Sequence, residues 1–335
     1  MEKFTNTEDF VARVRAFSGP DQAAIDAAKA RNGVLTKPPG ALGRMEELAI
    51  WYCGWRGDGA AQISNPQTVI FAGNHGVTAQ GVSAFPAEVT VQMVANFEAG
   101  GAAINQICKA VGSQLDVVAI DLDRPTADFT AAPAMSVEET AHALNCGWNA
   151  VRNDTDLLTI GEMGIGNTTS AAAIYAALFG RDGADWVGRG TGVDDTGLSR
   201  KADAVNRGVA RMGAAEPIEV LRQLGGREIA AMTGAIAGAR ARNIPVLIDG
   251  FIATAAAAIL HGIDASALDH CQAGHVSDEQ AHADVLARLG LDPILSLGMR
   301  LGEGSGAAAA IGIMRTALAC HSGMATFAEA GVSDG

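Results

Sequence analysis

A glutamate between glycines precedes the last long helical stretch of the chain. The segment reads Gly302-Glu303-Gly304-Ser305-Gly306 and leads into a predicted helix over 307–318. Glycines on both sides allow a ligand to approach the backbone closely. Glu303 has two interpretations. It is either an ordinary first-turn carboxylate favoured by the helix dipole, or a general base whose strength depends on how far burial raises its pKa.

A second glycine-rich loop covers 161–169, where the sequence reads Gly-Glu-Met-Gly-Ile-Gly-Asn-Thr-Thr. Gly164 and Gly166 permit a tight turn between a predicted strand and a predicted helix. The backbone N–H groups of Thr168 and Thr169 could then point at an anion. The loop lacks both the dinucleotide-binding spacing and the lysine of a P-loop. It is therefore either a loop for phosphate or another polar ligand, or a tight turn capped by Asn or Thr.

Two further loops combine glycines with polar residues. The segment 188–195 contains three alternating glycines and is followed by Arg200 and Lys201, which either neutralise a phosphate or form a solvated basic pair. The segment 73–76 contains His75, whose ring suggests acid–base chemistry. A histidine at the end of a strand is more often a hydrogen-bonded structural residue, and we expect that role for His75.

Metal and serine chemistry find little support in the sequence. The seven histidines and five cysteines show no zinc-binding spacing, and no H-E-x-x-H motif is present. There is also no G-x-S-x-G motif for a serine nucleophile. We therefore expect no metal site and no nucleophilic serine.

The elements that position these loops are short and regularly arranged. Four apolar, β-branched segments end next to glycine and polar residues, and alanine-rich helical stretches lie between them, including 170–179 and 234–242. The predicted strands cover 68–72, 115–120, 156–160 and 244–248. This alternation is typical of an α/β fold in which helices flank a parallel sheet. Ligands bind such sheets at the carboxyl ends of the strands, where these loops would lie.

Both ends of the chain read as helical. Residues 1–60 include two predicted helices, over 21–30 and 42–51, and we predict no strand before Thr68. The last forty residues become helical again after the Glu303 loop. We therefore predict a central α/β domain and a small helical domain built from both termini.

The charge balance limits the classes of partner. The formal net charge of the 335 residues is −13 at pH 7. An acidic surface repels polyphosphate backbones, so we expect no nucleic-acid binding. A phosphate on a small substrate must then be held by backbone N–H groups and a few local lysines or arginines.

Cysteine usage and hydropathy point to the cytoplasm. The five cysteines are scattered without a C-x-x-C motif, which is typical of reduced, buried thiols. The N-terminal segment has no apolar core of a secretory signal. The most apolar stretch, 244–260, is interrupted by Pro245, Asp249 and Gly250 and is too short to span a bilayer. We expect a cytoplasmic protein that does not enter a membrane.

Six segments in this order resemble one family, the nicotinate-nucleotide–dimethylbenzimidazole phosphoribosyltransferases. Together they extend from Lys37 to Gly306, so the resemblance covers nearly the whole chain. The segments are Lys37-Pro38-Pro39-Gly40-Ala41-Leu42-Gly43-Arg44, Asn74-His75-Gly76-Val77, the stretch 161–169, Met232-Thr233-Gly234, the stretch 246–251, and the stretch 300–306.

The resemblance implies both a fold and an activity. It implies a Rossmann-like parallel-sheet catalytic domain over 65–299 and a small helical domain from 1–64 and 300–335. It also implies a homodimer that uses no metal and no cofactor. The expected reaction moves the phosphoribosyl group of nicotinate mononucleotide to 5,6-dimethylbenzimidazole, in assembly of the cobalamin nucleotide loop.

The resemblance also assigns site residues. Glu303 falls on the position of the catalytic base, and Glu162 and Lys201 fall on other active-site positions. Gly164, Gly250 and Ser277 match positions around the nucleotide phosphate, while Met93 falls in the region that lines the pocket of the aromatic base. The remaining expected substrate-binding residues are Asn74, Ser83, Asn167, Thr168, Gly190 and Asp249.

One residue departs from the family pattern. Many members have aspartate where this chain has Asn74, so a carboxylate near the base-binding region is lost. The departure puts in doubt a role for charge at this position and can alter which bases are accepted.

Two other functions remain open from the residues alone. A nicotinamide-dependent dehydrogenase would share the α/β pattern and the glycine loops, although the dinucleotide fingerprint is absent. A non-catalytic protein that binds an aromatic base would keep the pocket without turnover.

Overall fold

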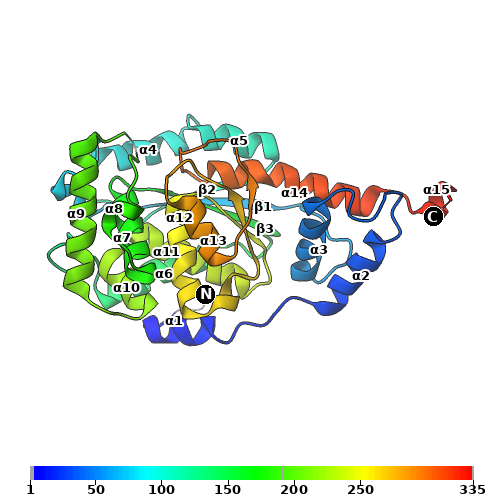
Figure 1. The fold of residues 1–335 in the computed structure, drawn as a ribbon, viewed down its shortest axis with the longest axis horizontal. Helices are drawn as coiled ribbons and strands as arrows, with labels where there is room; N and C mark the ends of the chain where they lie inside the picture. Colours follow the sequence, from blue (N-terminus) through cyan, green and yellow to red (C-terminus); the bar gives the residue numbers. More distant parts are fainter. Residues whose placement is uncertain (1–3, 191, 334–335) are drawn as a thin grey trace.

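Six parallel strands form a single sheet in the order β2-β1-β3-β4-β5-β6 (Figure 1). The computed structural model describes residues 4–333 except 191, so Met1, Glu2, Lys3 and Thr191 of the 188–195 loop lie outside the described residues. The order reverses at β1, which pairs with β2 on one side and β3 on the other. The strands are β1 (Pro66–Ala72), β2 (Gln114–Ala119), β3 (Leu157–Met163), β4 (Val246–Ile248), β5 (Cys271–His275) and β6 (Pro293–Leu295).

Burial follows the position of each strand in the sheet. All residues of β1 are buried, as are all but the last of β3, because helices cover both faces of these central strands. The edge strands β2 and β6 are only partly buried. The sequence accordingly reads as continuous apolar runs in the centre, and the four predicted strands are confirmed.

The other two strands were not predicted from the sequence. The residues of β5 include Ala273 and Gly274, which have low strand propensity, and β6 has only three residues and begins with Pro293. Both strands form because neighbouring strands and helices cover them. Strand β3 also extends beyond the predicted end at Ile160 and carries Glu162 as its penultimate residue.

Helices cover both faces of the sheet, which confirms the predicted α/β class (Figure 1). One face is covered by α6 (Val137–Ala150), α11 (Arg227–Arg240) and α12 (Phe251–Ile263), with α7 (Asn167–Phe179) and α10 (Pro217–Leu224) outside them. The other face is covered by α4 (Glu88–Glu98), α5 (Ala103–Val111) and α14 (Ser305–Gly323). The remaining elements of the α/β part are η1 (Gly76–Gln80), α8 (Gly183–Trp186), α9 (Asp195–Met212), η2 (Ala265–Leu268) and α13 (His282–Leu289).

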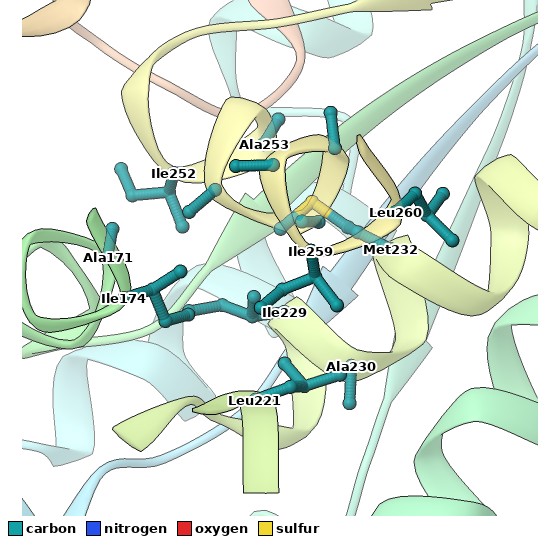
Figure 2. Close-up of a cluster of buried hydrophobic side chains, with 14 of the residues drawn as sticks. Ala171, Ile174, Leu221, Ile229, Ala230, Met232, Ile252, Ala253, Ile259 and Leu260 are labelled. Carbon is teal, nitrogen blue, oxygen red and sulfur yellow. The ribbon is translucent and has the colours of Figure 1, made fainter. Parts of the chain in front are cut away.

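Small residues bring the helices of the main core together. A Cβ on Gly147 of α6 would lie 1.7 Å from the carbonyl oxygen of Ala231, and one on Gly234 of α11 would lie 2.0 Å from that of Leu144. The two helices therefore pack backbone to backbone, which explains the glycine of the Met232-Thr233-Gly234 segment. Figure 2 shows the adjoining cluster, in which Met232, Ile259 and Leu260 pack with side chains from α7 and α10.

The long helix α14 connects the sheet with a separate group of helices (Figure 1). The group contains α2 (Gln22–Asn32) and α3 (Arg44–Arg56), and α15 (Phe327–Ala330) lies beside it. Leu48 and Tyr52 of α3 share one buried cluster with Ile311 and Met314 of α14. Helix α1 (Thr7–Val14) packs elsewhere, with Phe10 and Val14 in the core of the α/β part.

A buried ion pair anchors the loop that contains Lys37 and the two prolines. The ammonium group of Lys37 lies 2.9 Å from a carboxylate oxygen of Glu46 in α3, and both side chains are buried. Burial opposes ionisation of Glu46, but hydrogen bonds from Asn32, Lys37 and the Leu42 N–H lower its pKa to about 2. The Lys37–Arg44 segment is thus held against the terminal helices. None of the helices in the described residues is long and apolar enough to cross a membrane.

Candidate active site

The loop before α14 holds Glu303 in an unusual backbone conformation. Gly302, Glu303 and Gly304 have φ angles of +81°, +61° and +74°. Only glycine adopts this left-handed region without strain, and a non-glycine residue there costs about 1–3 kcal/mol. Ser305 stabilises the turn because its backbone N–H and its hydroxyl both donate to the carbonyl oxygen of Gly302. The strain is concentrated at the residue expected to act as the base.

The strand beneath this loop lacks a side chain where the loop crosses it. A Cβ on Gly161 of β3 would lie 2.3 Å from the backbone nitrogen of Gly304 and 2.6 Å from the carbonyl carbon of Glu303. Contacts below 3.0 Å are essentially never seen for real Cβ atoms. Gly161 therefore lets the Glu303 loop lie directly on the strand.

Asp249, which follows β4, binds the start of α14. One carboxylate oxygen accepts hydrogen bonds of 2.9 Å from the N–H groups of Gly306 and Ala307, and the other accepts one of 3.2 Å from Gly304. His275 at the end of β5 lies 3.3 Å from the same carboxylate. Asp249 thus occupies the N–H groups that would otherwise stabilise an anion at this helix end.

Glu303 is buried and retains a free oxygen. Its exposed fraction is 7 %, and Oε2 has no hydrogen-bond partner among the described residues. Burial raises the pKa of Glu303 to about 7, and the negative charge of Asp249 adds to the shift. A carboxyl group with a pKa near neutrality and an unoccupied oxygen can accept a proton from a ligand.

Glu162 lies next to the same loop. A Cβ on Gly302 would lie 2.4 Å from its Oε1, while the side-chain amide of Asn167 donates a hydrogen bond to its Oε2. Burial raises the pKa of Glu162 to about 8. The Asn167 bond opposes this shift, and the nearby carboxylates of Glu228, Asp249 and Glu303 add to it. At neutral pH the Glu162 carboxyl is therefore largely protonated and can donate a hydrogen bond.

These groups surround a cavity at the carboxyl ends of β3, β4 and β5. This cavity, called the main cavity below, encloses about 660 Å³ of space counted out to its open mouth. Its wall includes eight of the expected site residues: Glu162, Gly164, Asn167, Thr168, Gly190, Gly250, Ser277 and Glu303.

Two helix N-termini face the main cavity. Helix α7 begins at Asn167 after Gly166, and α12 begins at Phe251 after Gly250, and neither has a side-chain cap. The first residues of both helices line the cavity. At the start of α7 the N–H groups of Asn167 and Thr169 already donate to the carbonyl oxygens of Gly164 and Gly166, so the expected anion contact of Thr169 is not available. The other N–H groups at these two helix starts favour an anion, particularly with the helix dipole behind them. In contrast, the start of α14 is already occupied by Asp249.

A smaller side pocket adjoins the main cavity across the start of α7. It has a volume of about 290 Å³, and its wall includes Ser83, Arg189 and Lys201 together with Gly164, Asn167 and Thr168. The Lys201 ammonium donates to the Thr168 hydroxyl at 2.9 Å and to the Gly188 carbonyl oxygen at 2.7 Å. Burial lowers the pKa of Lys201 to about 8, although the charge of Glu279 opposes the shift. One of the three ammonium hydrogens remains for a ligand.

Three of the expected residues lie outside both cavities. Asp249 is behind the wall, where it holds the Glu303 loop as described. Asn74 is buried, donates to the Leu122 carbonyl oxygen at 2.8 Å, and has no partner for its Oδ1 among the described residues. Met93 packs in a small apolar cluster that also includes Met163, and Met163 lines the main cavity.

His75 has the buried, hydrogen-bonded environment expected from its place after a strand. One ring nitrogen lies 2.5 Å from Glu228 and the other 3.0 Å from the hydroxyl of Ser170. A Cβ on Gly164 would lie 3.3 Å from the ring. The His75–Glu228 pair therefore lies directly behind a glycine of the cavity wall.

The cavity wall also contains residues that the sequence did not single out. Arg300 and Leu301 line it from the segment before Glu303, His275 lines it at the end of β5, and Glu279 lines it beyond that strand. Arg300 belongs to a quoted segment, so proximity to Glu303 could have indicated it. His275 and Glu279 gave no signal because β5 was not predicted, although the family resemblance did indicate Ser277 between them. Among the described residues, no group of three or more His, Cys, Asp or Glu side chains has an arrangement that could hold a metal ion.

Comparison with known proteins identifies the family. A family model described as phosphoribosyltransferase matches residues 17–332. The nicotinate-nucleotide–dimethylbenzimidazole phosphoribosyltransferase of Ruegeria pomeroyi is 65 % identical over 335 residues and covers 100 % of both chains. That of Cereibacter sphaeroides is 62 % identical over 334 residues and covers 99 % of both.

A solved structure agrees with these sequence matches. The crystal structure of CobT from Thermus thermophilus superimposes with a TM-score of 0.89 at 41 % identity, covering 93 % of this chain and 100 % of that one. The relative from Ruegeria pomeroyi covers the whole chain, and the family model covers the sheet and every described helix except α1. The chain therefore belongs to the phosphoribosyltransferase family that includes the nicotinate-nucleotide–dimethylbenzimidazole phosphoribosyltransferases.

Proposed function

We propose that the chain transfers the phosphoribosyl group of nicotinate mononucleotide to 5,6-dimethylbenzimidazole, giving α-ribazole 5′-phosphate and nicotinate for cobalamin nucleotide-loop assembly. The observation that carries this proposal is the free, buried oxygen of Glu303 beside the main cavity. The names of the relatives in Ruegeria and Cereibacter state the same donor and acceptor.

The carboxyl groups around the cavity suit the donor. In nicotinate mononucleotide the pyridine nitrogen is quaternary, so cleavage of the C1′–N bond releases a neutral ring nitrogen and requires no acid. The transition state carries positive charge on the ribose. The Glu303 carboxylate would stabilise that charge, while the protonated Glu162 carboxyl would donate a hydrogen bond to the donor.

Glu303 would act as the general base. The unprotonated nitrogen of the benzimidazole attacks C1′, and the electrons of the breaking bond return to the nicotinate ring. The other benzimidazole nitrogen becomes acidic as the new bond forms. Its proton passes to Glu303 when the carboxylate lies within about 2.6–3.2 Å. Attack from the opposite face converts the β-linked donor into an α-linked product.

The phosphate end of the donor would be held away from Glu303. The uncapped starts of α7 and α12, together with Ser277 and Lys201, offer N–H, hydroxyl and ammonium donors. Gly164, Gly190 and Gly250 allow the backbone to approach the phosphate closely. Ser83 and Met93, near the side pocket and the apolar cluster beside Met163, are assigned to the acceptor base, and Asn74 supports that region from behind. Holding both substrates aligned can supply about 7–11 kcal/mol of the rate enhancement.

The decisive experiment incubates the protein with nicotinate mononucleotide and 5,6-dimethylbenzimidazole. We expect equal amounts of nicotinate and the α-linked riboside phosphate, and no product when either substrate is omitted. A protein that binds the benzimidazole without releasing nicotinate would be a binding protein instead. A change in absorbance at 340 nm with NAD and a substrate would indicate a dehydrogenase.

Organisation and location complete the proposal. We assign 1–64 and 300–335 to a small helical domain and 65–299 to the catalytic domain, which the shared cluster of α3 and α14 supports. Within these terminal segments α1 packs in the core of the α/β part, and α14 also packs against the sheet. A homodimer is supported by exposed apolar side chains such as Leu297 and Leu301, and light scattering would test it.

The five cysteines are free thiols, as expected in the reducing cytoplasm, and cell fractionation would test that location.

A further inference from the structure

A buried histidine outside the cavity wall connects two loops that the proposed function assigns to the donor phosphate. His282, the first residue of α13, is fully buried. Its Nδ1 lies 2.8 Å from the backbone nitrogen of Ser277, and its Nε2 lies 2.9 Å from the hydroxyl of Thr254. The hydroxyl of Thr254 in turn donates to the carbonyl oxygen of Gly250 at 2.9 Å.

These contacts determine the protonation of the ring. The Ser277 backbone N–H can only donate, so Nδ1 of His282 must carry a lone pair. The hydroxyl hydrogen of Thr254 is used on Gly250, so its oxygen accepts from Nε2–H. The ring is therefore neutral with its proton on Nε2. Burial lowers the pKa of His282 to about 3, and His275 adds to the shift, which keeps the ring in this form.

The two connected loops lie in direct contact at the cavity. A Cβ on Gly250 would lie 3.5 Å from Cβ of Ser277 and 3.8 Å from its hydroxyl oxygen. Gly250 precedes the uncapped start of α12, and both residues line the main cavity. A small shift of one loop relative to the other would therefore separate the donor groups that face a ligand.

We propose that His282 is a positioning residue, whose neutral ring fixes the loop after β5 to the loop after β4 so that their N–H and hydroxyl groups converge on the donor phosphate. The inference rests on the proposed function, because it takes the donor phosphate as the ligand of these two loops. His282 makes no contact with the substrate in this scheme. It acts through Ser277 and Gly250.

The test is the kinetics of His282→Asn, with each substrate varied separately. Asparagine retains an acceptor near the Nδ1 position and loses the donor to Thr254. We expect the KM for nicotinate mononucleotide to rise about tenfold, with the KM for 5,6-dimethylbenzimidazole and the kcat within about twofold of wild type. The inhibition constant of ribose 5-phosphate should rise by the same factor as the donor KM.

Two other variants make the result specific. Thr254→Val removes the hydroxyl at nearly constant volume and should shift the donor KM in the same direction, which decides the matter if His282→Asn does not fold. His270 is the matched control. It is equally buried, it lies just before β5 at the end of the strand opposite the site, and its ring is hydrogen-bonded to the Ile236 carbonyl oxygen. His270→Asn should lower the melting temperature and leave both KM values unchanged.

The inference is overturned if a folded His282→Asn variant keeps the wild-type donor KM, if both KM values rise together, or if His270→Asn has the same effect. Failure of the proposed function has a different signature, since wild-type protein would then release no nicotinate. In that case, calorimetric binding of ribose 5-phosphate to wild type and His282→Asn decides the role of His282. Equal affinities would refute it.

Discussion

Gly161 of β3 and Gly304 are packed so closely that a methyl group on Gly161 would lie 2.3 Å from the Gly304 nitrogen. The strand thereby supports the backbone that carries Glu303. The position of the proposed base thus depends on a residue with no functional group of its own.

Replacement of Gly161 by alanine should displace the Glu303 loop. We expect kcat to fall by about 10²-fold, because a misplacement of about 1 Å can have that effect, and stability to fall by about 1–3 kcal/mol from overpacking. Steady-state kinetics and thermal unfolding would measure both. Gly312→Ala in α14 is the control, since a Cβ there meets nothing within 4 Å in the described structure. Its activity should be unchanged, and equal losses in both variants would contradict the prediction.

Glu303→Gln should retain the fold and lose the base. The amide matches the carboxyl in shape but cannot accept the benzimidazole proton, so kcat should fall by about 10²- to 10⁴-fold. Donor affinity, measured by calorimetry, should stay close to that of the wild type. Turnover near the wild-type value would exclude Glu303 as the base.

The pH dependence of kcat/KM should be bell-shaped. Only ionised Glu303 accepts a proton, so the rate should rise through a pKa of about 7. It should fall above about 8, where Lys201 loses its positive charge and Glu162 loses its proton. Because these groups interact, the two apparent pKa values belong to the group of residues as a whole. Rates at constant ionic strength would test this, and a profile that is flat from pH 6 to 8 would refute it.

Lys201→Ala should weaken binding of the donor more than it slows chemistry. A lost charge-assisted hydrogen bond to phosphate corresponds to a rise of about 10- to 100-fold in the donor KM. The KM for the benzimidazole should change little. Lys109→Ala, at an exposed lysine of α5, is the control. An unchanged donor KM in the Lys201 variant would remove Lys201 from the phosphate site.

Stability should decrease with pH because of Glu162. Its carboxyl titrates at about 8 in the folded protein, but near 4.3 in an unfolded chain. Between these values the folded state holds the extra proton, so the stabilisation is complete below about pH 4 and is lost as pH rises through 8. Glu162→Gln should reduce the difference in melting temperature between pH 5.5 and 8.5. Exposed Glu47→Gln should not, and an undiminished difference in Glu162→Gln would show that other groups cause it.

The sequence predicts the central strands β1 and β3 of the sheet better than the strands β5 and β6 near one edge. The apolar runs of β1 and β3 and the glycines after them mark strands and loops by local chemistry. Strand β5 shows no such pattern, because Ala273 and Gly274 are in a strand only through the pairing and packing around them. Its absence from the prediction explains why His275 and Glu279 were missed.

The ionisation of the site residues depends on contacts between segments that are distant in the sequence, and no local sequence pattern reveals these contacts. The free oxygen of Glu303 depends on Asp249, which lies 54 positions earlier and takes the helix N–H groups. The protonated state of Glu162 depends on burial beneath Gly302 and on charges from three other segments. A resemblance to a family can indicate which residues gather at a site, but their ionisation becomes visible only from the folded arrangement.

Helix α14 connects the Glu303 loop with the group of terminal helices. It begins directly after the Glu303 loop, and its later turns provide Ile311 and Met314 to the apolar cluster with α3. Its nineteen residues form a rod of about 28 Å. Unfolding of α2 and α3 would remove the packing around the later turns of α14. The Glu303 loop at the start of α14 would then become more mobile. Loss of turnover on heating should therefore coincide with unfolding of the terminal helices, as a single cooperative event.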